Sequence, residues 1–281
     1  MIEHEHRYYP SSRNKSDTCL ICGFRPKPVI FGNCLEVLKD FEDVCIDLTV
    51  TSPPYDNLRT YNGYFFDFEG IARELYRVTK DGGVVVWVVG DSCNNFCESL
   101  TSFKQAIFFV EKCGFNLLDT MIYYKNNYAP AYPGMKRYAN QFEYMFIFSK
   151  GKPNNYNPVQ EEKKEIANGI KSYRQPDGSL KKKILLDNGR KTKDASNVWR
   201  YSVGGKDNGH PAPFPEKLAE DHILSWSNEG DTVLDPFAGS GTTLKMAKKN
   251  NRKYIGIEIS EEYIKIIEKR LEGLTQNSLG I

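Results

Sequence analysis

A short run early in the chain, Thr51-Ser52-Pro53-Pro54-Tyr55, has residue types that can act on an aromatic amine. It follows the apolar, β-branched run 44–50, which predicts a buried strand. That strand must end at the prolines, because proline has no N–H to donate to a β-ladder. Ligands of open α/β sheets bind just beyond the carboxyl ends of such strands. The Ser52 hydroxyl and the loop carbonyls can accept amine protons, and the Tyr55 ring can stack on a flat ring.

A second candidate site lies late in the sequence, where a strand predicted at 232–234 runs into the glycine-containing turn 235–243. Glycines let the backbone approach a ligand, and the helix that begins at Thr242 presents free N–H groups. Glu258 ends the next predicted strand, where an acidic side chain can bind ribose hydroxyls. The turn lacks the Gly-x-Gly-x-x-Gly dinucleotide pattern. Asp235 suits a ligand with an ammonium and a sulfonium, such as S-adenosylmethionine; a tight turn without a ligand is the alternative.

Alternating strands and helices must position these two sites. Strands are expected at 28–32, 44–50, 84–90, 115–124, 142–148, 232–234 and 253–258. Helices are expected at 34–41, 68–78, 102–113, 215–226, 242–249 and 261–271, and Asp81-Gly82-Gly83 is expected to form a turn. The alternation predicts an α/β fold with a doubly wound, mostly parallel, Rossmann-like sheet.

An irregular, basic segment interrupts this alternation and sets the expected domain boundaries. We expect an N-terminal arm over 1–27, one half of the main domain over 28–149, an insert over 150–209 and the other half over 210–281. From residue 150 to residue 206 there are 14 Lys and Arg against 6 Asp and Glu, whereas the whole chain has a net charge of only +2. This local excess favours contact with a polyanion, with a solvated loop as the alternative.

The composition, 40% hydrophobic and 26% charged over 281 residues, is typical of a globular protein. No apolar run approaches the about 20 residues of a membrane helix, so we expect a cytoplasmic protein without a membrane span. Seven cysteines fit reduced thiols better than a disulfide framework. Cys19 and Cys22, with His4 and His6, are types that bind zinc, but the second Cys-x-x-Cys of the usual signature is missing, and we expect no metal.

Taken together, the two sites resemble those of β-class DNA amino-methyltransferases, in which the catalytic half precedes the cofactor half. The family has a Ser-Pro-Pro-Tyr or Asp-Pro-Pro-Tyr loop, a variable target-recognition region, and an Asp-Pro-Phe-x-Gly-x-Gly-Thr-Thr turn. All three occur here in this order, within about residues 28–272. The resemblance implies a circularly permuted methyltransferase fold. It also implies methyl transfer from S-adenosyl-L-methionine to the exocyclic amine of a base rotated out of double-stranded DNA.

The resemblance also assigns roles to individual residues. The catalytic loop would consist of Ser52, Pro53, Pro54 and Tyr55. The cofactor would be bound by Asn33, Thr51, Phe214, Asp235, Pro236, Phe237, Gly239, Ser240, Gly241, Thr242 and Glu258. Asn33 stands where the family often has Asp near the cofactor adenine, and its amide oxygen can still accept from an exocyclic amine. Phe214 stands where Lys is more usual.

The first residue of the loop bears on the target base. In the resembling family a serine such as Ser52 is commoner in N4-cytosine enzymes, and aspartate in N6-adenine enzymes. We therefore expect cytosine N4, with adenine N6 as the alternative. No cysteine follows a proline, which disfavours the thiolate nucleophile of C5-cytosine enzymes. Further alternatives are an RNA or protein-amide methyltransferase and an inactive DNA-binding module.

The basic segment would hold the DNA contacts. Lys181, Lys182 and Lys183 would meet phosphates, which position the DNA without specifying sequence. Side chains with suitable chemistry for base edges are Arg174, Gln175, Asn188, Arg190 and Asn197. A cognate restriction endonuclease and a second copy of the chain are further candidate partners. The whole interpretation requires that the double-proline corner and the glycine turn meet at neighbouring strand ends.

Overall fold

The computed structural model describes residues 28–54, 66–128, 136–163, 169–185, 191–203, 215–272 and 274. The chain divides into two compact units, a larger one of Met1–Asn157 with Asn197–Ile281 and a smaller one of Pro158–Ser196. The smaller unit is shorter than the insert expected over 150–209. Strand β12 (Val198–Tyr201) pairs with β6 of the main sheet, and it therefore belongs to the larger unit.

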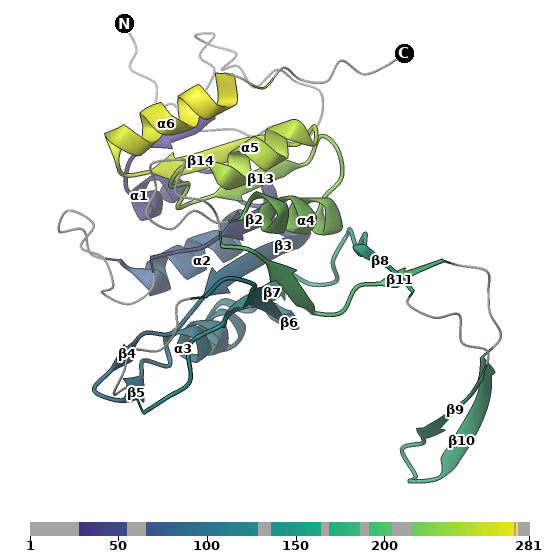
Figure 1. Cartoon of the computed structure of the whole chain (residues 1–281). Helices are drawn as coiled ribbons and strands as arrows, with labels where there is room; N and C mark the ends of the chain where they lie inside the picture. Colours follow the sequence, from purple (N-terminus) through teal and green to yellow (C-terminus); the bar gives the residue numbers. More distant parts are fainter. Residues whose placement is uncertain are drawn as a thin grey trace, which may run out of the picture. The chain divides into compact units, whose positions relative to one another are not determined.

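The larger unit is built on one eight-stranded sheet with the order β1-β14-β13-β2-β3-β7-β6-β12 (Figure 1). All neighbouring strands are parallel except β7, which runs antiparallel to both β3 and β6. The remaining strands span Val29–Phe31 (β1), Ile46–Thr51 (β2), Thr79–Val89 (β3), Asn116–Lys125 (β6), Phe142–Ser149 (β7), Thr232–Asp235 (β13) and Lys253–Glu258 (β14). The predicted mostly parallel α/β sheet is confirmed.

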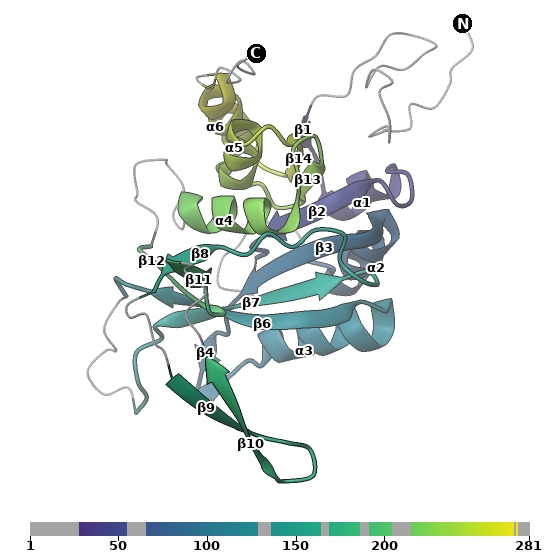
Figure 2. The same ribbon diagram turned by 90° about the vertical axis from the view of Figure 1, so that its right-hand side faces the viewer.

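Helices cover both faces of this sheet. They span Cys34–Lys39 (α1), Phe68–Val78 (α2), Thr101–Phe108 (α3), Glu216–Trp226 (α4), Thr242–Lys249 (α5) and Glu261–Glu272 (α6). Helices α1, α2 and α3 lie on one face, and α4, α5 and α6 on the other (Figures 1 and 2). The expected helix to Cys113 is completed by a π-helical segment, Phe109–Cys113, and Gly114 ends it in the left-handed conformation.

The prediction of a turn at Asp81-Gly82-Gly83 is wrong, because β3 begins at Thr79 and continues through these residues. Between the pairs Ile46↔Thr79 and Leu48↔Val84 the register shifts, so β3 carries extra residues opposite β2. The glycines therefore form a bulge within the strand instead of a turn before it.

Aromatic side chains dominate the core between β3, β7 and the helices on their face. Trp87, Phe109, Phe115 and Phe148 are fully buried, and their rings meet one another at tilted or edge-to-face angles. The indole N–H of Trp87 donates to the Gln105 Oε1 at 2.8 Å, so this buried polar group is satisfied. This core joins β3 and β7 to the α3 region on one face of the sheet.

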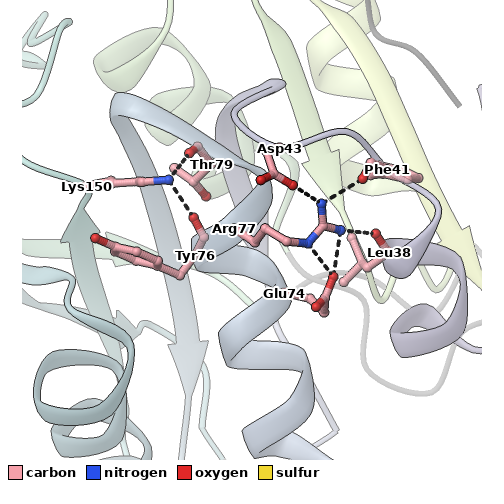
Figure 3. Close-up of polar contacts among 8 residues, drawn as sticks. All are labelled: Leu38, Phe41, Asp43, Glu74, Tyr76, Arg77, Thr79 and Lys150. Carbon is pink, nitrogen blue, oxygen red and sulfur yellow. Dashed lines mark hydrogen bonds and ion pairs between the residues drawn. The ribbon is translucent and has the colours of Figure 1, made fainter. Parts of the chain in front are cut away.

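Arg77 of α2 joins this helix to the end of α1 (Figure 3). Its guanidinium donates to the carbonyls of Phe41 and Leu38, both at 2.7 Å, and pairs with Asp43 and Glu74. Both carbonyls lie at or just beyond the carboxyl end of α1, and that of Leu38 also accepts from the N–H of Phe41 at 3.0 Å. Arg77 therefore stabilises the α1–α2 contact through both these backbone hydrogen bonds and its ion pairs.

Lys150, directly after β7, caps the carboxyl end of α2, close to Arg77 (Figure 3). Its Nζ donates to the carbonyl oxygens of Tyr76 and Thr79 at 3.0 and 2.9 Å. The same Nζ lies 4.6 Å from the centroid of the Tyr76 ring. A cation at this position satisfies one carbonyl in the last turn of α2 and that of the C-cap residue Thr79, and it complements the helix dipole.

The smaller unit contains two antiparallel strand pairs where the sequence predicted irregular structure. β8 (Gln160–Glu162) pairs with β11 (Thr192–Asp194), and β9 (Gly169–Arg174) with β10 (Leu180–Leu185). The prediction of irregular structure is therefore wrong for these residues. Its described strand residues are largely exposed on both faces, so no apolar alternation marks them in the sequence.

None of the described helices has the length and hydrophobicity that crossing a membrane requires. Within the described residues no three His, Cys, Asp or Glu side chains gather as metal ligands. Cys19, Cys22, His4 and His6 lie outside the described residues.

Candidate active site

The two sequence motifs meet at one edge of the sheet. β2 and β13 are parallel neighbours, with Leu234 opposite Thr49, so both motifs leave the sheet at adjacent carboxyl ends. The Thr51 Oγ1 donates to the Asp235 Oδ1 at 2.7 Å. The Thr243 Oγ1 donates to the carbonyl of Val50 at 3.2 Å. The predicted meeting of the double-proline corner and the glycine turn is confirmed.

Asp235 is a buried acid at the centre of this junction. Its side chain accepts from the hydroxyl of Thr51 and from the backbone N–H of Phe237, the latter at 3.1 Å. Burial raises the pKa of Asp235 to about 6, although the hydrogen bonds from Thr51 and Phe237 act in the opposite direction. A cation bound beside this carboxyl would favour its ionised form, so the site is suited to a cationic ligand.

The glycine turn has a backbone that only glycine adopts easily. Gly239 and Gly241 have φ values of +52° and +77°. A Cβ on Gly241 would also lie 2.9 Å from a side-chain carbon of Ile267 in α6. The turn is therefore shaped both by its left-handed residues and by close packing against α6.

Glu258 holds this turn against the end of β14. Its Oε2 accepts from the N–H of Gly239 at 2.7 Å, and its Oε1 from those of Ile259 and Ser260, both at 2.9 Å. Burial raises the pKa of Glu258, backbone hydrogen bonds oppose this, and the negative charge of Asp235 adds to the rise. Because a carboxylate oxygen accepts about two hydrogen bonds, Oε2 has capacity for a ligand hydroxyl.

Ser240 and Thr242, expected to line the cofactor, direct their hydroxyls toward α6. Arg270 donates to the backbone oxygen of Ser240, to its Oγ at 3.0 Å and to the Thr242 Oγ1 at 3.4 Å. It also pairs with Glu216 at 2.8 Å, which in turn pairs with Lys245 at 2.7 Å. Sequence reasoning missed Arg270, because no local pattern connects the last turn of α6 with the glycine turn.

Asn33 lies beside Glu258, but its amide oxygen already has a partner. It is the N-cap of α1, and its Oδ1 accepts from the N–H of Leu35 at 2.9 Å. The preceding Gly32 donates its N–H to the carbonyl of Glu258 at 3.0 Å. Burial raises the pKa of the neighbouring Cys34 thiol to about 12, so it is protonated near pH 7.

The structure describes part of the Ser-Pro-Pro loop and of the aromatic side of the glycine turn. Ser52 and Pro54 are half-buried and Pro53 is buried. Pro236 is buried, and the ring of Phe237 packs edge-on against Phe66, with centroids 5.6 Å apart. The expected site residues outside the described residues are Tyr55, Phe214 and Arg190.

The expected DNA-contacting residues lie in the smaller unit except Asn197, which belongs to the larger unit and whose amide donates to the Asp119 Oδ1 at 3.3 Å. Lys181 and Lys182 are exposed on β10, and the backbone of Lys183 continues the same strand. Arg174 is exposed, and its guanidinium donates to the carbonyl of Gly178 at 3.0 Å within the β9–β10 hairpin. The two lysines are therefore available to solvent.

Known proteins resemble this chain over most of its length. Residues 46–269 match the family model described as DNA methylase, of the N6/N4 type. The chain is 55% identical over 249 residues to the orphan methyltransferase M.BamHII of Bacillus amyloliquefaciens, which covers 83% of this chain and 91% of that protein. It is 27% identical to the type II methyltransferase M.SmaI of Serratia marcescens, over 92% of this chain and 95% of that protein.

Solved structures show the same fold. The cytosine-N4-specific PvuII DNA methyltransferase has a TM-score of 0.65 and 21% identity, covering 89% of this chain and 86% of its own. A DNA modification methylase of Thermus thermophilus, in complex with S-adenosyl-L-methionine, has a TM-score of 0.58 and 28% identity, over 86% of this chain and 91% of its own.

The sheet has the Rossmann-like fold of the solved neighbours, and the family model and the 55% identical relative define a methyltransferase of the amino-methylating class. The chain belongs to the N6/N4 DNA methylase family, and it is a site-specific DNA methyltransferase.

Proposed function

We propose that this chain transfers a methyl group from S-adenosyl-L-methionine to the N4 amine of cytosine in double-stranded DNA, with adenine N6 as the second candidate. The observation that supports this most is the 2.7 Å hydrogen bond between Thr51 and Asp235. It joins the Ser-Pro-Pro loop to the acidic glycine turn, so that groups suited to an amine and to a cationic cofactor share one strand edge.

The residues present fit the cofactor. When bound, S-adenosyl-L-methionine supplies an electrophilic methyl group on a positively charged sulfur. Asp235, whose pKa burial raises to about 6, would bind the positively charged methionine end, together with the backbone around Gly239. Glu258 would accept from ribose hydroxyls through Oε2, and Asn33 would lie near the adenine. Ser240 and Thr242 would act indirectly, because Arg270 uses their oxygens to fix the turn.

The Ser-Pro-Pro loop would orient the amine. Its nitrogen lone pair is delocalised into the base and must become available for attack. The hydroxyl of Ser52 and the carbonyl of Pro53 would accept the two amine protons, and Tyr55 would stack on the base rotated out of the duplex. Catalysis then depends mainly on positioning and electrostatics. A strong base is unnecessary, because the nitrogen's proton becomes acidic once the nitrogen is cationic.

The choice of cytosine depends on Ser52, the loop residue commoner in N4-cytosine enzymes of this family. The test is to incubate the protein with duplex DNA and cofactor labelled in its methyl group, digest the DNA, and separate the nucleosides. We expect label in N4-methylcytosine. Label in N6-methyladenine would show that the target is adenine N6 and not cytosine N4. Unlabelled DNA would overturn the enzymatic assignment in favour of an inactive DNA-binding module.

The smaller unit supplies a candidate DNA-contacting surface through Lys181 and Lys182 of β10, which are exposed. Lys183, Arg174 and Arg190 remain candidates for the same surface. A cognate endonuclease is also a proposal: type II names among the relatives support one, whereas the orphan name of M.BamHII supports an enzyme that works alone. Light scattering would test a homodimer.

A further inference from the structure

A short hairpin that follows β3 carries an exposed aromatic ring at its tip. β4 (Cys93–Asn94) and β5 (Cys97–Glu98) pair antiparallel, and Asn95 and Phe96 form the two-residue turn between them. Their φ values are +50° and +63°. Two-residue hairpin turns of this kind need positive φ at both positions, which Asn tolerates and Gly prefers. A bulky residue such as Phe is rarely found there.

The strained position of Phe96 is not explained by packing within the described part of the chain. Its side chain is 81% exposed, and it belongs to neither of the core clusters that contain Trp87 and Leu244. A glycine at this position would relieve the backbone strain, and a polar residue would avoid exposing a ring to water. Strained residues of this kind commonly have a role in function.

The hairpin stands at the same sheet edge as the candidate active site. β3 is the parallel neighbour of β2, and Thr51 lies opposite Trp87. Because β3 ends at Val89 and β4 begins at Cys93, the hairpin leaves the sheet beside the strand end that leads into Ser52. Figure 1 shows β4 and β5 beyond the end of β3.

The base of the hairpin is firmly anchored. Asp91 accepts from the Ser99 Oγ at 3.1 Å and from the N–H of Ser102 at 3.0 Å, and the Ser102 hydroxyl also donates to it. The Ser99 N–H donates to the carbonyl of Ser92 at 3.0 Å. These bonds tie both ends of the hairpin to the start of α3, so Phe96 is presented on a rigid support.

The length of the hairpin suits contact with DNA, and the charges around it balance, with Asp91 and Glu98 against Arg137 and Lys104. Glu98, the acid of the hairpin, is paired with Arg137 at 3.0 Å. Lys104, on the first turn of α3, lies at the hairpin base, where its Nζ donates to the carbonyl of Ser99 at 3.0 Å. A strand rises about 3.3 Å per residue, so the tip stands on the order of 10 Å beyond Ser92. The grooves of B-DNA are about 7.5–8.5 Å deep, so such a tip reaches the bases.

We propose that Phe96 inserts into the DNA base stack next to the target base and stabilises the duplex from which that base has rotated. Apolar side chains inserted between base steps unstack them in this way. The inference rests on the proposed function, because it requires a base to leave the stack. It adds a DNA-contacting residue in the larger unit, separate from the lysines of the smaller one.

The test compares Phe96→Ala, Phe96→Gly and Phe96→Trp with the wild type. Ile107→Ala is the control, because it removes an exposed apolar side chain from the outer part of α3, away from the hairpin tip. We expect Phe96→Ala and Phe96→Gly to lower the methylation rate of duplex DNA at least tenfold, with unchanged cofactor affinity by calorimetry. Phe96→Trp should retain most activity, and Ile107→Ala should match the wild type. Phe96→Gly should keep or raise the melting temperature, because glycine relieves the turn.

A second substrate separates insertion into the stack from general binding. Once the methylated position is mapped, the same variants are assayed on a duplex that lacks the base opposite the target. We expect the loss in Phe96→Ala to shrink to threefold or less there, because the target base is already unpaired. If the wild type is active and Phe96→Ala methylates at the same rate, this inference is overturned and the proposed function stands. An equal fold-loss of Phe96→Ala on both substrates would also overturn it, because the ring would then contribute to DNA binding in general and not to insertion into the stack. A wild type that methylates no DNA would instead overturn the proposed function, and this inference with it.

Discussion

Replacing Asp235 with Asn separates the stability of the empty protein from its affinity for a cationic cofactor. Burial raises the pKa of this carboxyl from 3.8 to about 6. Each pKa unit corresponds to about 1.36 kcal/mol, so keeping Asp235 ionised at pH 7 costs about 3 kcal/mol of folding free energy. Asn is close in shape and still has an oxygen that can accept from Thr51. We therefore expect Asp235→Asn to be more stable than the wild type at pH 7 by up to about 3 kcal/mol.

The sign of the pH dependence follows from the raised pKa. Below about pH 4 the acid is protonated in both folded and unfolded chains, so Asp235 imposes no ionisation penalty. Between about pH 4 and pH 6 the unfolded chain ionises first, so wild-type stability falls, and above about pH 6 the difference is constant. Asp235→Asn lacks this contribution, and the stability difference between variant and wild type should grow over that window.

Two measurements check this prediction. Denaturant unfolding of the cofactor-free proteins from pH 4 to pH 8 gives the stability difference, and calorimetric titration gives cofactor affinity. Wild-type affinity should fall as the pH drops below about 6, and Asp235→Asn should bind weakly throughout. A stability difference that does not change between pH 4 and pH 6, or equal affinity in the two proteins, would refute the reasoning.

Other perturbations test other parts of the structure. Ser52→Ala should lower the methylation rate on the order of 100-fold with unchanged cofactor affinity, because it removes one acceptor for the amine; an unchanged single-turnover rate would remove Ser52 from the mechanism. Replacing Lys181 and Lys182 with Gln should reduce the slope of log affinity against log salt by about 1.8, and an unchanged slope would place the phosphate contacts elsewhere. Lys150→Met should destabilise the fold by about 1–3 kcal/mol, because two carbonyls lose a charged donor. The exposed Lys152→Met is its control, and equal melting temperatures would contradict the capping role.

The meeting of the two motifs could be predicted from the sequence alone. Each motif directly follows a short apolar strand, and parallel strands joined by helices place their carboxyl ends at one edge. The strands Ile46–Thr51 and Thr232–Asp235 lie where that argument requires, side by side. Helix α4 could also be predicted, because its apolar residues repeat at helical spacing; in the structure they are buried.

The smaller unit and the support of the glycine turn could not be predicted. β10, with the sequence Leu-Lys-Lys-Lys-Ile-Leu, has no apolar alternation, and its strand structure depends on pairing with β9. In the sequence Arg270 is an ordinary cation in the last turn of a helix. Its hydrogen bonds to Ser240 form only when α6 packs on the sheet. The sequence Gly82-Gly83 predicts a turn, because glycine adopts backbone conformations that other residues avoid. In the structure the same conformational freedom allows a bulge within β3.

The most direct test of the central claim is a crystal structure of the protein with S-adenosyl-L-methionine. The account predicts that the methionine end lies against Asp235, with the methyl group directed toward Ser52 and Pro53. A cofactor bound at another edge of the sheet, or one whose methyl group faces away from Ser52, would contradict the account.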